Sequence, residues 1–165
     1  MASTTDKIEK RVFLKAPQEK VWRALSDAKA FGDWFGVELD GPFAPGRRMI
    51  GHVKPTVADA EIAKMQEKHA GMRFEFIIDT IEPMKTFSYR WHPFAIEKDV
   101  DYSKEPMTLV TFSLEPAEGG TMLTVVETGF DALPIARKTD AFEANEEGWA
   151  IQVQLVEKYL QLAKS

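Results

Sequence analysis

The sequence predicts an α+β protein in which antiparallel strands form one sheet and helices cover one side of it. Short segments of alternating apolar and polar residues, separated by turn residues, fill the middle of the chain. One long amphipathic segment, 133–165, follows the last of these strands. Because no linker, repeat or low-complexity tract divides the chain, we expect a single domain over residues 1–165.

The first elements are a strand and two short helices. Residues 7–14 predict the strand. Pro17 suits the first turn of a helix, where its missing N–H costs nothing, and apolar residues recur after it at helical spacing. Residues 30–35 predict a second short helix or turn, which Gly36 ends.

About five further strands follow. They are predicted at residues 47–53, 72–81, 86–92, 107–114 and 121–128. Turn residues at 82–85 and 115–120 separate some of them. Residues 55–71 interrupt the series, and the helical propensity of 57–69 within them leads us to interpret 55–71 as an insertion near the mouth of the fold.

Composition excludes several classes of function. The net charge is -5 and no basic stripe is present, so we expect no nucleic-acid partner. The absence of cysteine excludes disulfides and thiolate sites. Residues 1–10 lack the apolar core of a signal peptide, and no apolar run approaches the ~20 residues of a membrane span. We therefore expect a cytoplasmic protein without a membrane span.

Short stretches spread over the chain carry a family resemblance. They are residues 12–17, 21–27, 87–91, 119–121, 126–130 and 148–149. On these residues the chain resembles the START-like superfamily, also called SRPBCC or the birch-pollen-allergen fold. Within it, the chain is most similar to bacterial members of the activator of heat-shock protein 90 ATPase homologue family.

This resemblance implies a helix-grip fold. In that fold a curved antiparallel sheet, here of about six strands, wraps around the long C-terminal helix, with two short helices after the first strand and a cavity between. Members of the superfamily bind lipids, sterols, polyketides or plant hormones, and some are cyclases or hydroxylase components. The narrower family takes its name from a co-chaperone activity of eukaryotic relatives.

A set of aromatic residues falls on the inward phase of the strands and on the long helix. They are Phe74, Phe76, Tyr89, Trp91, Phe112 and Trp149. The rings either line an apolar pocket, on whose walls a ligand stacks, or fill a solid core. Both interpretations stay open on the residues alone, and the family resemblance favours the cavity.

Glu127 is the most suggestive single residue. Strict alternation places it on the same face as Leu123 and Val125, so an apolar interior for these two also places the carboxylate inside. A buried carboxylate must be paired, hydrogen-bonded or protonated. It could bind a ligand hydroxyl or amine or act as a general base. The alternatives are a strand end that reaches solvent, an opposite phase with Val126 inward, or an ion pair with Arg47, Arg48 or Arg90.

Two further features have a structural and a functional interpretation. Trp34 and Phe35 lie between glycines and form either a mobile aromatic lid over the pocket or an anchor for their helix. Gly148 is unusual inside a helix, where it costs ~1 kcal/mol against alanine. Close approach of a ligand or of a strand would explain it, and so would a kink.

Catalytic and metal motifs are missing from the sequence. The three histidines, His52, His69 and His92, have no metal-binding spacing, so we expect no metal site. No nucleophile motif or phosphate-binding loop occurs, and we expect no cofactor and assign no catalytic residue.

The predicted function is binding of a small apolar or amphipathic molecule in an internal cavity. The expected ligand-binding residues are Phe74, Phe76, Tyr89, Trp91, Phe112, Glu127, Trp149, Trp34 and Phe35. Two alternatives are a co-chaperone-like module acting on a heat-shock chaperone ATPase and a cyclase- or hydrolase-type enzyme that uses the cavity carboxylate. The sequence leaves two protein partners open, a second copy of the chain in a homodimer and a chaperone.

Overall fold

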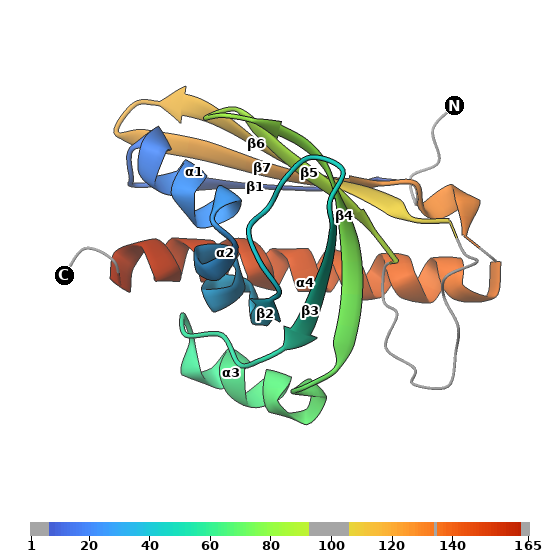
Figure 1. The fold of residues 1–165 in the computed structure, drawn as a ribbon. Helices are drawn as coiled ribbons and strands as arrows, with labels where there is room; N and C mark the ends of the chain where they lie inside the picture. Colours follow the sequence, from blue (N-terminus) through green and yellow to red (C-terminus); the bar gives the residue numbers. More distant parts are fainter. Residues whose placement is uncertain (1–6, 93–105, 134, 163–165) are drawn as a thin grey trace.

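The computed structural model describes residues 7–92, 106–133 and 135–162 of the chain. Seven strands form one antiparallel sheet in the order β1-β7-β6-β5-β4-β3-β2. Their bounds, in this spatial order, are Lys7–Leu14, Gly120–Thr128, Thr108–Ala117, Thr86–Trp91, Arg73–Glu82, Arg48–Val53 and Val37–Leu39. The sheet curves, so that its two edges approach the same side (Figure 1).

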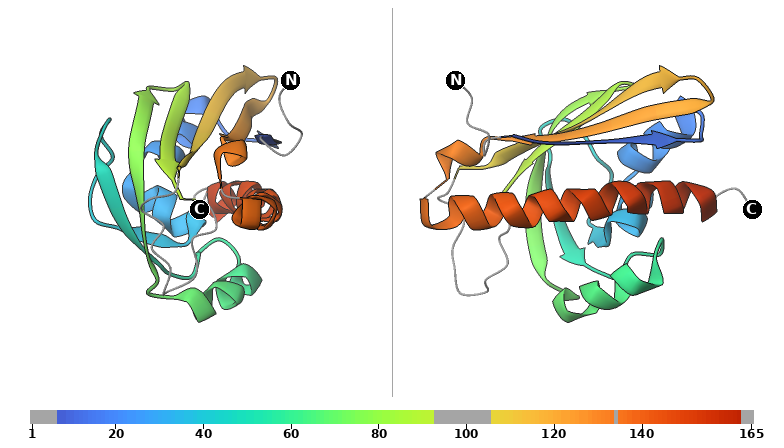
Figure 2. Two further views of the ribbon diagram at one scale, coloured as in Figure 1. Left: turned by 90° about the vertical axis from the view of Figure 1, so that its right-hand side faces the viewer. Right: turned by 180° about the vertical axis from the view of Figure 1, so that it is seen from behind.

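The helices cover one face of this sheet. Helix α4 (Ile135–Leu162) runs along the concave side, and the end-on view shows the strands bending around it (Figure 2). Helices α1 (Gln18–Ser26) and α2 (Ala28–Phe35) lie on the same face. The predicted α+β class and the helix-grip arrangement are both confirmed, with two short helices after the first strand.

The sheet has one strand more than expected. Strand β2 was not predicted, because three residues are too few for an alternating pattern to stand out. Strand β6 is also longer than predicted, since Pro116 and Ala117 pair with Thr121 and Gly120 rather than forming part of the turn. The turn is therefore shorter than the predicted one at 115–120, and Gly119 takes a positive φ of 82° within it.

The second helix begins earlier than predicted because Asp27 caps it. The Asp27 carboxylate accepts a hydrogen bond from the Ala30 amide at 2.9 Å, which satisfies one of the free N–H groups of the first turn. The helix ends at Gly36, whose φ of 96° is left-handed. This cap fixes where Trp34 and Phe35 lie.

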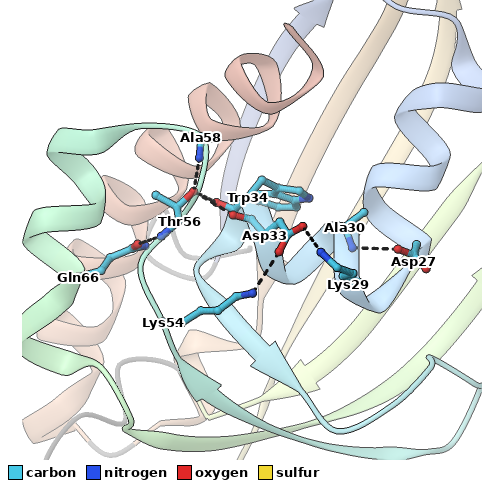
Figure 3. A network of polar contacts seen from close by, with 9 residues as sticks. All are labelled: Asp27, Lys29, Ala30, Asp33, Trp34, Lys54, Thr56, Ala58 and Gln66. Carbon is cyan, nitrogen blue, oxygen red and sulfur yellow. Dashed lines mark hydrogen bonds and ion pairs between the residues drawn. The ribbon is translucent and has the colours of Figure 1, made fainter. Parts of the chain in front are cut away.

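Residues 55–71 contain helix α3 (Ala60–Gln66) followed by a 3₁₀ turn, Glu67–His69. None of the α3 residues is buried. The helix is held to the body by side chains instead (Figure 3). Thr56 donates its hydroxyl to the Trp34 carbonyl at 2.8 Å, and its amide donates to the Gln66 side chain at 2.7 Å. That the segment is an insertion stays a prediction.

Asp33 links α2 to the start of this segment. Its carboxylate pairs with Lys29 at 2.9 Å and with Lys54 at 3.1 Å (Figure 3). Burial alone would raise the pKa of Asp33, but the hydrogen bonds and charges of the two lysines lower it below its usual value. The network therefore holds the C-terminal half of α2 in place at neutral pH.

Fully buried rings fill the space between the sheet, α1 and α2. This ring core consists of Phe31, Trp34, Phe76, Phe87, Tyr89 and Phe112. Ring centroids within it lie as close as 4.7 Å, between Phe76 and Tyr89, and 4.9 Å, between Phe31 and Trp34. Such distances are those of directly packed aromatic pairs.

Candidate functional site

Glu127 lies on β7 and is completely buried, with an exposed fraction of 0%. Leu123 and Val125 are also 0% exposed, so the inward phase expected from the alternation is confirmed. In the sheet Glu127 stands opposite Ile8 on one neighbouring strand and Val110 on the other. The carboxylate therefore points from the inner face of the sheet, near the end of β7, toward α4.

Four side chains donate hydrogen bonds to this carboxylate. One oxygen accepts from Trp91 Nε1 at 2.8 Å and from Thr108 Oγ1 at 2.5 Å. The other oxygen accepts from Asn145 Nδ2 at 2.8 Å and from Trp149 Nε1 at 2.8 Å. A carboxylate offers about four lone-pair positions, so all of them are used. An indole N–H can only donate, which fits an acceptor-only carboxylate.

Among the residues whose side chains the structure describes, no arginine binds the Glu127 carboxylate. The three arginines considered from the sequence pair elsewhere: Arg47 with Asp40, Arg48 with Glu75 and Arg90 with Asp79. Among the described residues, the partners of Glu127 are all neutral. Within this part of the chain, the carboxylate is stabilised by hydrogen bonds from neutral donors on strands β5 and β6 and on helix α4.

A pocket opens beside this network. Its volume is about 90 Å³, and we call it the aromatic pocket. It is lined by Phe35, Trp91, Asn145, Gly148, Trp149 and Gln152. Three of these six residues also bind Glu127. The pocket therefore lies where the end of α2, strand β5 and the middle of α4 meet.

Three rings of the aromatic pocket form a nearly equilateral triangle. The Phe35 centroid is 6.1 Å from Trp91 and 6.1 Å from Trp149, and the two indole centroids are 5.9 Å apart. The ring planes are inclined to one another by 60°, 60° and 35°. Rings inclined in this way do not stack flat on one another, and all three line the aromatic pocket.

Gly148 leaves space over α4 at this point. A Cβ added there would meet no atom within 4 Å. No strand therefore requires glycine at this position, which removes one of the explanations considered from the sequence. The helix gives up ~1 kcal/mol of propensity relative to alanine, and the space it leaves forms part of the aromatic pocket.

Two buried polar atoms near the site lack a hydrogen-bond partner. Gln152 donates its amide to the Phe35 carbonyl at 3.2 Å, while its buried Oε1 accepts none. The Tyr89 hydroxyl, on a residue only 1% exposed, also has none. Burial raises the pKa of the Tyr89 phenol well above its usual value, and the nearby Glu127 charge raises it further.

The predicted ligand-binding residues fall into two groups. Trp91, Trp149 and Phe35 line the aromatic pocket, with Glu127 directly behind it. Four others belong to the ring core, namely Trp34, Phe76, Tyr89 and Phe112. The Trp34 indole donates to the Ala24 carbonyl at 2.8 Å, so this residue anchors its helix. The Phe74 side chain lies outside the described residues.

Sequence reasoning missed Thr108, Asn145 and Gln152. For the helix residues a signal existed, because positions 145, 148, 149 and 152 recur at the three- and four-residue spacing of one helix face. Amide side chains beside a glycine and a tryptophan on that face would have indicated a polar rim. Thr108 gave no such signal, since it stands 19 residues from Glu127 in the sequence.

Two larger hollows lie elsewhere on the surface. One, of about 310 Å³, lies beside the start of α2 and strand β2, and another, of about 240 Å³, lies between the end of β1 and the end of α4. Neither is lined by a residue predicted to bind ligand. In the described part of the chain, no three metal-ligating side chains gather at one point, and no helix is long and apolar enough to span a membrane.

Comparison with known proteins identifies the family. The family model described as Activator of Hsp90 ATPase homolog 1-like protein matches residues 15–161. The chain belongs to this family. The resemblance inferred from the short sequence stretches is thereby confirmed. No curated protein matches the chain.

Solved structures share the fold over nearly their whole length. Protein MLL2253 from Mesorhizobium loti has 22% identity and a TM-score of 0.68, with 94% of this chain and 96% of that chain covered. Protein NE0264 from Nitrosomonas europaea has 17% identity, a TM-score of 0.69 and 99% coverage of both chains. A protein from Arthrobacter aurescens has 17% identity and a TM-score of 0.72, with 95% of this chain and 87% of that chain covered. At these identities the likeness extends to the fold alone.

Proposed function

We propose that this protein binds a small apolar or amphipathic molecule, and that the aromatic pocket is its binding site. The observation that carries the proposal is the open space over Gly148, which lies in a surface pocket lined by Phe35, Trp91 and Trp149. A glycine without a packing neighbour costs helix stability. Occupation of the space by a ligand would recover contacts that the empty pocket lacks.

The walls of the pocket are preorganised. The two indoles are fixed by their hydrogen bonds to Glu127. The Phe35 carbonyl accepts from Gln152 at 3.2 Å and from Gln66 at 3.3 Å, and the Phe35 ring stacks on Phe31 with centroids 4.9 Å apart. Side chains that are already ordered lose little entropy when a ligand binds, which favours affinity. Glu127 then acts as a positioning residue rather than as a direct ligand contact.

The size of the pocket limits what it takes. Sites for whole drug-sized molecules measure roughly 300–1,000 Å³. The aromatic pocket, at about 90 Å³, holds one small group of a ligand whose remainder lies outside it. The rings of the ring core pack closely, with the Phe76 and Tyr89 centroids 4.7 Å apart.

A ligand screen with a pocket-filling variant tests this proposal. Gly148→Leu puts a branched side chain into the space while leaving the Glu127 network in place. We expect some sterols, long-chain alcohols or amphipathic amines in a small panel to raise the thermal midpoint of the wild-type protein but not of the variant. Equal midpoint shifts in both proteins would place binding elsewhere and contradict the proposal.

A protein-interaction function is the second candidate. Val57 and Met65, in the segment around α3, are 56% and 58% exposed, which is unusual for large apolar side chains. The family name makes an Hsp90-type chaperone the partner to test. Stimulation of the chaperone's ATPase rate by the wild type, and its loss in a Val57→Ser, Met65→Ser variant, would support it. An unchanged ATPase rate would exclude it.

Catalysis by Glu127 has no support in the geometry. A general base needs a free lone pair within reach of the proton that it removes. All four lone-pair positions of Glu127 are occupied by Trp91, Thr108, Asn145 and Trp149. A substrate would first have to displace one of these donors.

A further inference from the structure

We propose that the aromatic pocket recognises a methylated ammonium group, such as the trimethylammonium head of a choline-like ligand. This rests on the proposed function and names the chemical class of the group that enters the site. Three observations support it: the arrangement of the rings, the buried negative charge behind them, and the polar atoms at the edge of the pocket.

The ring arrangement suits a cation held over several faces. Cation–π attraction acts when a cation lies within about 6 Å of a ring centroid, and tryptophan is the best partner. Because the three centroids are 5.9 to 6.1 Å apart, one group above the triangle can lie within this distance of all three. Two of the three rings are indoles. A methylated ammonium group combines the positive charge with an apolar surface that matches the walls.

The charge of Glu127 makes the pocket selective for cations. The described residues that line the pocket include no lysine or arginine, and the carboxylate has neutral partners alone. The Trp91 and Trp149 indoles lie between this charge and the pocket. Each donates its Nε1–H to a carboxylate oxygen, which polarises the ring and makes its face more negative. A neutral guest gains nothing from this charge, whereas a cationic guest does.

The polar atoms around the pocket favour a group without N–H donors. Both oxygens of Glu127 are filled by its four donors. Gln152 Oε1 is buried rather than open to the pocket, and its amide nitrogen is used by the Phe35 carbonyl. A primary ammonium would bring three N–H donors that need acceptors, whereas a quaternary ammonium brings none.

The test compares choline with its neutral carbon analogue, 3,3-dimethyl-1-butanol, which has the same shape. Binding is followed by NMR through the indole Nε1–H signals of Trp91 and Trp149. We expect choline to bind about tenfold more tightly than the alcohol. Equal affinities would overturn the cation proposal while leaving an apolar site intact. The proposal would also be overturned if choline did not bind at 100 mM while another ligand bound to the wild type and lost its binding in Gly148→Leu.

Matched variants show whether the rings act as proposed. Phe35→Leu keeps an apolar wall but removes one ring, and we expect it to lower the preference for choline over the alcohol about threefold. Phe43→Leu removes another partly buried ring, one that does not line the aromatic pocket, and should leave the preference unchanged. The same preference in the wild type and in Phe35→Leu would contradict the proposal.

One further comparison distinguishes a lipid head group from a free small molecule as the carrier of the ammonium group. Free choline is compared with a soluble short-chain phosphatidylcholine, dihexanoyl phosphatidylcholine. Tighter binding of the lipid would support recognition of a lipid head group, and equal binding would support recognition of a free small molecule. A lipid that binds more weakly than free choline would exclude a lipid head group and also support a free small molecule.

Discussion

The ring core and the aromatic pocket are built from the same kind of side chain, yet one is filled and the other is open. In the ring core, Phe31 contacts both Trp34 and Phe112. Every member of the ring core is almost fully buried. In the aromatic pocket, Phe35 and Trp91 are only partly buried, and Gly148 leaves space between them. The first region stabilises the fold, and the second retains the unfilled volume that a ligand needs.

The two regions touch, since Phe35 stacks on Phe31 with centroids 4.9 Å apart, but a polar group distinguishes them. The buried Glu127 carboxylate holds two indoles by their N–H groups, so these rings cannot turn inward to close the space. In the ring core no such group fixes the phenylalanines, and they pack on one another. Hydrogen bonding to a buried charge is thus what keeps an aromatic cluster open.

The largest expected loss of stability comes from a substitution in the ring core. Phe112→Ala should lower the free energy of unfolding by about 3–5 kcal/mol, because it leaves a cavity among rings that cannot collapse. Phe35→Ala, in the pocket, should cost about half as much, since its side chain is already partly exposed. Urea denaturation of both variants measures the difference. Equal losses would mean that the two regions are packed alike.

Loss of the Glu127 charge is the next effect in size. Glu127→Gln keeps the shape but turns an amide toward groups that donate, so at least one buried donor loses its acceptor. We expect the free energy of unfolding to fall by about 1–3 kcal/mol. The Trp91 and Trp149 indole N–H signals should move in the NMR spectrum. Unmoved signals together with unchanged stability would contradict the role assigned to the carboxylate.

A substitution at Gly148 should have a smaller effect on stability, in the opposite direction. Gly148→Ala should raise the free energy of unfolding by ~1 kcal/mol, because alanine favours the helix and its Cβ meets no atom. Thermal denaturation measures this gain. A loss of stability would show that the space over Gly148 is filled in solution by a neighbouring group.

The smallest effect concerns the Tyr89 hydroxyl. Its raised pKa means that the folded state favours the neutral phenol, so this contribution to stability is complete below pH ~10 and is lost as the pH rises above it. In an absorbance titration, Tyr89 should ionise only together with alkaline unfolding. Tyr89→Phe should reduce the amplitude of that phase and, since the hydroxyl has no partner, should cost little stability. An unchanged amplitude would contradict the assignment.

The fold followed from the sequence to a large extent. Alternation located six of the seven strands, and the long apolar stripe located α4, because both patterns repeat over enough residues to be recognised. The inward direction of Glu127 followed from the same alternation. The three-residue strand β2 could not be found in this way, since its pairing with β3 is decided by tertiary contacts.

The site was less accessible to sequence reasoning. The donors to Glu127 come from positions 18 to 36 residues away, so no local pattern joins them. The division of the aromatic residues between a filled and an open cluster depends on ring packing in three dimensions. The family resemblance favoured a cavity, and the poor fit of Gly148 to a helix interior was open to a ligand, a strand or a kink as its explanation.

Native mass spectrometry of the protein purified from its own host tests the central claim most directly. The claim is that the space over Gly148 receives a ligand. The wild-type protein is predicted to carry a small molecule whose occupancy falls in Gly148→Ala, although that variant is the more stable protein. Equal ligand occupancy in the two proteins would contradict the claim. A ligand-free mass for the wild type would also contradict it if the ligand panel raised the thermal midpoint of Gly148→Leu as much as that of the wild type.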